Sequence, residues 1–261
     1  MTKYLAFGLL SVFFMQCPAK NDSRSFKSEV FTSSDGHELP LRILYPDNYS
    51  KSKAYPILIF LHGSGERGSN NQDQLVHIAP SFLTDEFQSK YEAIIVFPQC
   101  AENDSWARME EREEGSWLVQ SDKPATSPTK ALLEWINIFK TETSVDPTRT
   151  FIAGLSMGGF GTMDILYRRP NMFAAAVPIC GGGNSRFISS FRQVPIWIFH
   201  GAKDPVVPVS LSRSIAESCK ALKVNYRYTE YPEGGHDVWN KAWEEPGLVD
   251  WIFSQQLQKS E

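Results

Sequence analysis

A serine stands between two glycines where an apolar strand pattern changes into a helical one. Gly154-Leu155-Ser156-Met157-Gly158 has the spacing G-x-S-x-G, and the apolar run before it favours a buried strand. Such a strand-to-helix turn is so sharp that the serine lies in strained backbone geometry with its Oγ exposed. The two glycines are needed because a Cβ at either position would collide with neighbouring backbone. The segment therefore predicts that Ser156 is a nucleophile.

A serine hydroxyl is a poor nucleophile near neutral pH unless a histidine takes its proton and a carboxylate orients that histidine. After a turn of this kind, the acid is expected to follow the serine in the chain, and the histidine to follow the acid. Asp204 lies in the turn after one apolar strand pattern, and His236 follows Gly234-Gly235 in the loop after the next. Because ligand sites lie at the carboxyl ends of parallel strands, we expect Ser156, Asp204 and His236 to meet there.

Both assignments have alternatives. Asp204 precedes a proline, and Asp-Pro is common in turns without a catalytic role. Asp237 adjoins His236, but neighbouring residues rarely face one another, so Asp204 is the preferred acid. The other histidines are interpreted as surface, packing or backbone-bonding residues: His37 in a hairpin turn, His77 in an amphipathic helix, and His62 and His200 at strand ends.

Two backbone amides are expected to bind the oxyanion of a tetrahedral intermediate. One is the amide of Met157, directly after the nucleophile. The other is the amide of Ser64, in a loop where Gly63 and Gly65 let the backbone turn inward after a strand at residues 57–61. A glycine-rich loop could instead cradle a phosphate. This one has neither of the glycine spacings of nucleotide-binding loops.

These segments resemble the α/β-hydrolases, and most closely the bacterial esterases related to the prolyl-oligopeptidase catalytic domain and to polyhydroxybutyrate-depolymerase and feruloyl-esterase types. The likeness runs from about residue 29 to the C-terminus. It is carried by LHGSGERG at 61–68, FPQC at 97–100, DPTR at 146–149, AAVPICGGG at 175–183, HGAKDPVVP at 200–208 and GGHD at 234–237. The resemblance implies serine hydrolase chemistry through Ser156, Asp204 and His236, on a scaffold that accepts many acyl groups.

The expected fold class is α/β: an α/β-hydrolase fold with a mostly parallel eight-stranded sheet and helices on both faces. Strand and helix patterns alternate along most of the chain, which favours parallel pairing, whereas Ser-Asp-Gly at 34–36 joins the first two strands as an antiparallel hairpin. The predicted strands are 26–32, 39–45, 57–61, 93–97, 150–153, 174–179, 195–200 and 224–231. With 261 residues, 42% of them hydrophobic, the chain can form one catalytic domain over residues 29–261.

Residues 1–19 have the pattern of an export signal. Lys3 precedes an apolar run at 5–15 that is too short to span a bilayer but suits a signal-peptide core. Cys17 at its end indicates a lipoprotein signal, although the residues before it are bulkier than usual. Cleavage after Ala19, as an ordinary secretory signal, is the alternative. Polar residues 20–28 are expected to tether the domain, and the protein is expected to be periplasmic, secreted or lipid-anchored.

Charge and cysteine content narrow the possible partners. A net charge of −4 without a Lys/Arg cluster argues against nucleic acid or an anionic membrane surface, so membrane attachment is expected only through a lipid at Cys17. Because Cys and His do not occur at metal-ligand spacing, no metal is expected, and the predicted serine chemistry needs no organic cofactor. Cys100, Cys180 and Cys219 are interpreted as small buried thiols.

A long polar loop follows residue 100 and carries Trp106 and Trp117 beside a run of charges. Long loops in compact domains are usually functional or disordered. Packing against the domain is the preferred interpretation of the tryptophans, and a substrate-binding role for Trp106 is the alternative.

The sequence as a whole predicts an exported serine carboxylesterase that forms an acyl-enzyme with a small-molecule or carbohydrate-linked ester. A serine peptidase of prolyl-oligopeptidase type is the first alternative, but such enzymes add a large propeller domain for which the chain has no room. A non-catalytic binding protein on a hydrolase scaffold is the second. The acyl and alcohol specificity does not follow from these motifs.

Overall fold

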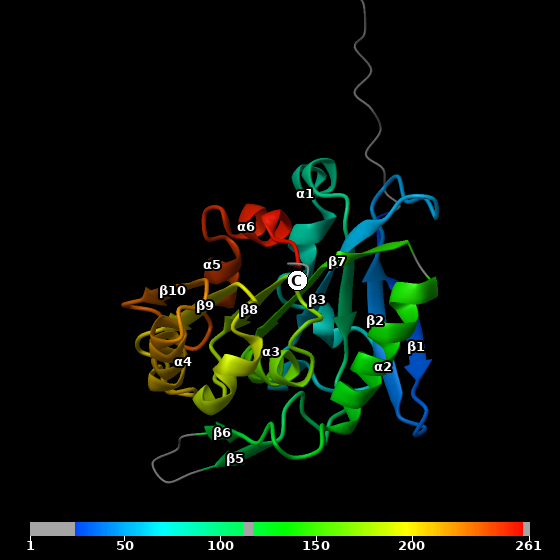
Figure 1. Cartoon of the computed structure of the whole chain (residues 1–261). Coiled ribbons are helices and arrows are strands. Elements are labelled where there is room, and N and C mark those ends of the chain that lie inside the picture. The colour runs from blue at the N-terminus through cyan, green and yellow to red at the C-terminus, as the bar shows by residue number, and fades with distance from the viewer. Residues whose placement is uncertain (1–23, 112–116, 143, 258–261) are drawn as a thin grey trace, which may run out of the picture.

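A central sheet of eight strands organises the computed structural model, which describes residues 24–111, 117–142, 144–257 (Figure 1). Its strand order is β1-β2-β4-β3-β7-β8-β9-β10. The strands are β1 (Lys27–Thr32), β2 (Glu38–Leu44), β3 (Tyr55–Leu61), β4 (Ile94–Pro98), β7 (Val145–Leu155), β8 (Ala175–Ile179), β9 (Ile196–Gly201) and β10 (Tyr226–Tyr231). The pairs that involve β2 are antiparallel and the others are parallel. The predicted fold class and each of the predicted strands are confirmed, although β7 begins earlier than expected.

Helices cover both faces of the sheet because the parallel strands are apolar on both sides. In β3, Ile57, Ile59 and Leu61 belong to one core cluster, whereas Leu58 and Phe60 belong to the other. The first face is covered by α2 (Ser127–Glu142), α3 (Met157–Arg168) and α4 (Ser210–Ala221). The second face is covered by α1 (Asp85–Lys90), α5 (Trp239–Trp243) and α6 (Leu248–Ser254) (Figure 1). Both layers are therefore held by apolar burial against one sheet.

A short hairpin replaces part of the long loop expected after residue 100. It consists of β5 (Met109–Glu111) and β6 (Trp117–Val119), and it lies below α3 in the view of Figure 1. Met109 and Trp117 pack against a small apolar cluster that contains Phe160 of α3 and Val207. Strands of three residues are too short for an alternating pattern to be recognised in sequence, so this element was not predicted.

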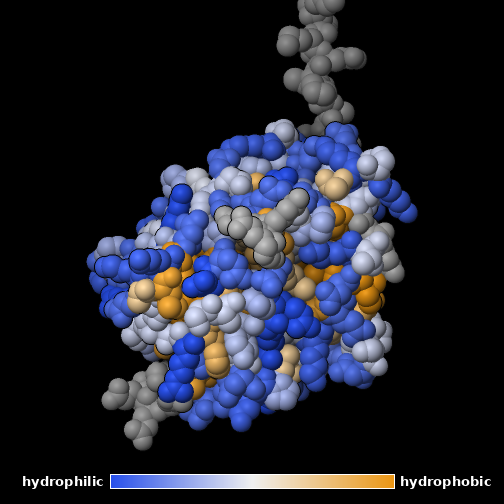
Figure 2. Space-filling model, viewed as in Figure 1, coloured by the Kyte–Doolittle hydropathy of each residue, from blue (hydrophilic) through white to orange (hydrophobic). Residues whose placement is uncertain are grey.

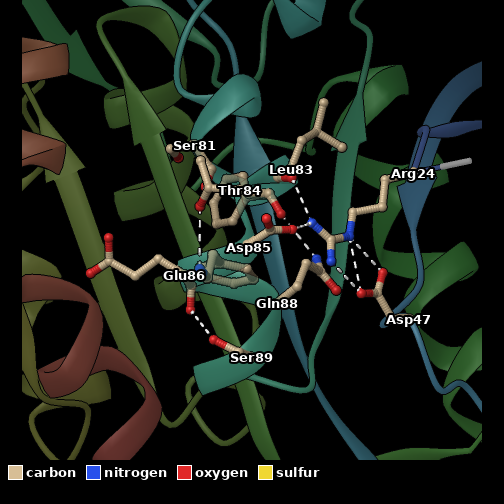
Figure 3. Close-up of polar contacts among 11 residues, drawn as sticks. Arg24, Asp47, Ser81, Leu83, Thr84, Asp85, Glu86, Gln88 and Ser89 are labelled. Atoms are coloured by element: carbon tan, nitrogen blue, oxygen red, sulfur yellow. Dashed lines mark hydrogen bonds and ion pairs between the residues drawn. The ribbon is translucent and has the colours of Figure 1, made fainter. Parts of the chain in front are cut away.

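Arg24 fixes the beginning of the described chain to the domain. Its Nε donates to both carboxylate oxygens of Asp47, at 2.8 and 3.0 Å, and its Nη1 donates to the Leu83 carbonyl and to Asp85, the first residue of α1 (Figure 3). Residues 24–28 of the predicted tether are thus docked, and residues 27–28 belong to β1. Residues 20–23 and the predicted signal at 1–19, with Cys17, lie outside the described residues.

The surface in view is mostly hydrophilic, with apolar residues in separate small areas (Figure 2). The most exposed large apolar side chains of the described chain include Val76, at 64%, and Val206, at 57%. Within the described residues, none of the helices is both long enough and apolar enough to cross a bilayer.

A glycine pair offers a test of how tightly α3 packs on β3. A Cβ at Gly158 would overlap the Leu61 carbonyl and lie 2.8 Å from the His62 oxygen, whereas a Cβ at Gly65 would have no neighbour within 4 Å. Because the obstructing atoms are backbone, we expect Gly158→Ala to lower the free energy of unfolding by about 3 kcal/mol or more. Gly65→Ala, the matched control, should unfold at nearly the wild-type urea concentration. Equal unfolding midpoints for the two variants would contradict this packing.

Candidate active site

Ser156 occupies a strained turn between the end of β7 and the start of α3. Its φ of 51° and ψ of −117° are rare for a residue with a side chain, and strain of this kind costs about 1–3 kcal/mol. The turn is held on both sides: the Ser156 amide donates to the Ile179 carbonyl at 2.8 Å, and its carbonyl accepts from Phe160 at 3.1 Å. A Cβ at Gly154 would overlap the Gly158 carbonyl. The turn predicted from the sequence is present.

The structure brings Ser156, His236 and Asp204 into one line of hydrogen bonds. His236 Nε2 lies 2.9 Å from Ser156 Oγ, and His236 Nδ1 lies 2.7 Å from Asp204 Oδ2. A carboxylate only accepts, so Nδ1 carries the proton and Nε2 is free to accept the serine proton. Asp237, the alternative acid, has an exposed position on the loop. The three groups predicted from the sequence therefore have the geometry of a nucleophile, a base and its orienting acid.

The loops after β9 and β10 are joined by backbone contacts. The Lys203 amide donates to the Gly234 carbonyl and the Ala202 amide to the Tyr231 carbonyl, both at 2.9 Å. A Cβ at Gly201 would overlap the Gly235 carbonyl, so glycine is needed for this approach. These contacts explain why the acid and the base, which are 32 residues apart, meet.

Asp204 is buried but richly hydrogen-bonded. Its side chain is inaccessible to solvent, and its Oδ1 accepts from the amides of Val206 and Val207, both at 2.8 Å. Burial by itself raises the pKa of Asp204, but the hydrogen bonds from His200, His236 and the two amides outweigh it and hold that pKa well below its usual range. Asp204 therefore stays ionised and can stabilise a positive charge on His236.

The loop after β3 passes directly over the nucleophile. A Cβ at Gly63 would lie 3.6 Å from the Ser156 Cβ, which places the predicted oxyanion loop with Ser64 at the site. Met157, the other predicted donor, is the first residue of α3. Glu66 Oε2 accepts from the Gly63 amide at 2.9 Å and so fixes the start of the turn. The two backbone segments expected to bind an oxyanion are thus next to Ser156.

His62 fixes the same loop through two hydrogen bonds to backbone. Its Nε2 accepts from the Cys100 amide at 2.9 Å, so the ring proton is on Nδ1, which donates to the Gly63 carbonyl at 2.6 Å. Burial lowers the pKa of His62 to about 4, which keeps the ring neutral. The sequence interpretation of His62 as a histidine that bonds backbone beside the site is consistent with this placement.

Trp106 lies in the core and not in a substrate pocket. Its side chain is fully buried, its Nε1 donates to the His62 carbonyl at 3.2 Å, and a Cβ at Gly161 would collide with it. The substrate-binding alternative for Trp106 is therefore wrong on physical grounds, because a fully buried indole has no surface to offer a ligand. The preferred interpretation, packing against the domain, agrees with the structure.

Trp239 is half-buried beside His236 and was not identified as part of the site from the sequence. The Trp239 ring lies 5.5 Å from that of His236 and 5.1 Å from that of His77, whose Nε2 is 3.4 Å from Glu66 Oε1. His77 lies in a bend between two 3-10 turns, so the helix predicted there is wrong. Only Glu66 had a signal, since it stands three residues after Gly63 at the spacing of a capping box.

Cys180 lies beside Asp204 and His236. Potential ligand atoms of Cys180, Asp204 and His236 all lie within 4.8 Å of one another. Burial raises the pKa of the Cys180 thiol to about 12, and the other two groups are already bonded to each other. The hydrogen bond between Asp204 and His236 therefore explains why these ligand atoms lie close together. Cys100, Cys180 and Cys219 are free and buried, as expected.

Comparison with known proteins places the chain in a family. A family model described as phospholipase/carboxylesterase matches residues 48–245. The chain belongs to this family. A structure of a thermostable esterase is 33% identical with a TM-score of 0.81, over 89% of this chain and 63% of that one. A ferulic acid esterase from Anaeromyces mucronatus, 18% identical with a TM-score of 0.64 over 92% and 96% of the two chains, shares the fold.

Two curated relatives add to this comparison. Mouse lysophospholipase-like protein 1 is 23% identical over 213 residues, which cover 76% of this chain and 86% of that protein. A bifunctional acetylxylan esterase/xylanase from Neocallimastix patriciarum is 25% identical over 167 residues, 64% of this chain but 22% of that protein. The chain thus spans about a fifth of that relative's length. The family model and these relatives confirm the α/β-hydrolase resemblance.

His62 generates a prediction about pH and stability. A histidine in the unfolded chain binds a proton near pH 6.5, whereas His62 in the fold stays neutral down to about pH 4. The unfolded state binds more protons in this window, so stability falls as the pH falls, by about 2 kcal/mol between pH 7 and pH 5. Urea unfolding at the two pH values should show this loss for the wild type and a smaller one for His62→Gln. Equal losses would contradict the buried neutral state.

Proposed function

We propose that the protein is an exported serine esterase that hydrolyses carboxylic esters through Ser156, His236 and Asp204. The observation that carries the proposal is the unbroken hydrogen-bond chain from Ser156 Oγ to Asp204 Oδ2, with distances of 2.9 and 2.7 Å across His236. These side chains come from loops after β7, β9 and β10, at the edge where open α/β sheets bind ligands.

Ester cleavage then proceeds in two stages. Ser156 Oγ attacks the ester carbonyl while His236 Nε2 takes its proton, and Asp204 stabilises the imidazolium that forms. The oxyanion accepts hydrogen bonds from the Met157 and Ser64 amides, and each such donor contributes roughly a hundredfold or more in rate. His236 returns the proton to the leaving alcohol. Water then attacks the acyl-Ser156 with His236 again as base, which releases the acid.

A small-molecule or carbohydrate-linked ester is the proposed substrate. Support comes from relatives whose names include acetylxylan esterase and from a fold neighbour named ferulic acid esterase. The peptidase alternative has weaker support, because the matching family model is described as phospholipase/carboxylesterase, whereas the acylaminoacyl peptidase of similar fold is only 18% identical. The non-catalytic alternative is opposed by the intact hydrogen-bond chain at Ser156.

The roles of the proposed groups can be tested with a fluorophosphonate probe and a p-nitrophenyl ester. We expect Ser156→Ala to lose both labelling and ester hydrolysis, since it lacks the attacking oxygen. Asp204→Asn and His236→Ala should each lose about a thousandfold or more in kcat, because such residues act as a unit.

Asp237→Asn is the matched control for the acid. It changes the carboxylate next to His236 in sequence and should keep nearly all activity. Near wild-type turnover by Ser156→Ala would refute the nucleophile. Activity that survives in Asp204→Asn but is lost in Asp237→Asn would reverse the choice of acid.

Export is part of the same proposal. It is supported by Lys3, the apolar run at 5–15 and Cys17. Mass spectrometry of the protein from its native host should find either an acylated N-terminal Cys17 or an unacylated product that begins near Lys20. In the first case Cys17→Ser should release the enzyme from membranes. Active protein from the cytoplasm with an intact Met1 would argue against both forms.

A further inference from the structure

A second histidine contacts the carboxylate of Asp204. His200 is the last residue of the strand predicted at 195–200, which corresponds to β9. It is fully buried and lies four residues before Asp204. Its Nε2 lies 3.2 Å from Asp204 Oδ2, the same oxygen that bonds His236, and 3.0 Å from the Val207 carbonyl. We propose that His200 is a positioning residue. It orients Asp204 and partly neutralises the negative charge that Asp204 presents to His236. This inference rests on the proposed role of Asp204 as the acid.

The surroundings of Nε2 determine where the ring carries a proton. Both neighbours of this nitrogen, Val207 O and the Asp204 carboxylate, only accept hydrogen bonds. A bare Nε2 would leave three sets of lone pairs facing one another in a buried site, which is costly. His200 therefore has a hydrogen on Nε2, which donates to the Val207 carbonyl, while Asp204 Oδ2 lies beside it at 3.2 Å from the nitrogen.

The other nitrogen ties His200 to α4. Nδ1 lies 2.7 Å from Ser212 Oγ, which in turn lies 3.1 Å from the Gly181 carbonyl. Ser212 has one hydroxyl hydrogen, which is shared between Nδ1 and Gly181 O as possible acceptors. Ser212 therefore ties the ring both to α4 and to the backbone that follows β8.

The carboxylate of Asp204 is thereby held by three hydrogen bonds and one close contact. The amides of Val206 and Val207 bind Oδ1, His236 Nδ1 binds Oδ2, and His200 Nε2 lies 3.2 Å from Oδ2. A rotation of the carboxylate would break these bonds together, so Oδ2 remains directed at His236. Donors to a carboxylate also stabilise its charge, so His200 weakens the attraction of Asp204 for a proton on His236.

Other titratable groups near His200 are accounted for. Glu230 on β10 is paired in register with His200, but its carboxylate accepts from Arg213 of α4 at 2.9 and 2.6 Å and from Tyr228. Cys180, at the end of β8, has a thiol pKa raised to about 12 by burial. Asp204 is thus the ionised group that the Nε2 hydrogen of His200 reaches.

Two substitutions separate the donor from the ring. In His200→Gln the side-chain amide nitrogen can take the place of Nε2 and still donate, whereas His200→Phe keeps a flat ring without a donor. We expect His200→Phe to lower kcat roughly 10- to 100-fold with KM changed less than about threefold. The acid limb of kcat/KM should also move to higher pH, because Asp204 then stabilises the protonated base more strongly. His200→Gln should recover most of kcat and the wild-type limb.

The controls distinguish the possible failures. An acid limb that is unchanged in folded His200→Phe, or equal impairment of the Phe and Gln variants, would overturn the inference. Asp204→Asn measured in parallel tests the proposed function: if it keeps full activity, that function fails, and if it is inactive while His200→Phe behaves as wild type, only the inference fails.

The wild-type protein supplies a measurement that does not require a His200 variant to fold. Nitrogen-15 NMR of the histidine-labelled enzyme should show an exchange-protected hydrogen on His200 Nε2, and Asp204→Asn should move that resonance. A His200 ring with its only hydrogen on Nδ1 would refute the donor role.

Discussion

Backbone segments at the carboxyl edge of the sheet approach one another more closely than side chains would permit, and the site depends on this approach. Gly158 brings α3 against Leu61 of β3, and Gly201 brings the acid loop against Gly235 of the base loop. The first contact places the oxyanion loop over Ser156, and the second places Asp204 beside His236. A Cβ at either glycine would separate elements that must meet for proton transfer.

Burial and hydrogen bonding act in opposite directions on the charged groups of the site. Burial alone would favour a neutral Asp204, yet its bonds to two amides and two imidazoles keep it ionised. His62 accepts a hydrogen bond from one amide and donates one to a carbonyl, so burial prevails and the ring stays neutral. The number and charge of the partners decide which histidine or carboxylate is charged. A neutral His62 suits a structural role, and an ionised Asp204 suits an electrostatic one.

The three triad residues lie on loops, so the precision of their geometry depends on how firmly those loops are held. Loops usually move more than the elements they connect, but here Lys203 ties the acid loop to Gly234 of the base loop, and Ser156 ties its own turn to Ile179 at the end of β8. Trp106 packs against α3 and the loop after β3, and the hairpin of β5 and β6 packs against Phe160 and Val207. Such support is what keeps reacting groups within the narrow geometry that catalysis requires.

Local sequence determined the eight sheet strands and the turn at Ser156, because each depends on residues a few positions apart, and the order of the motifs along the chain indicated Asp204 and His236. Only the tertiary structure decided that Trp106 is buried, that His77 lies outside a helix beside Trp239, and that His200 bonds Asp204. Those outcomes depend on contacts between distant segments, such as Gly161 with Trp106, or on the fold of a loop around a buried carboxylate. A residue's type limits which bonds it forms, but its neighbours in space select among them, and that selection has no signal along the chain.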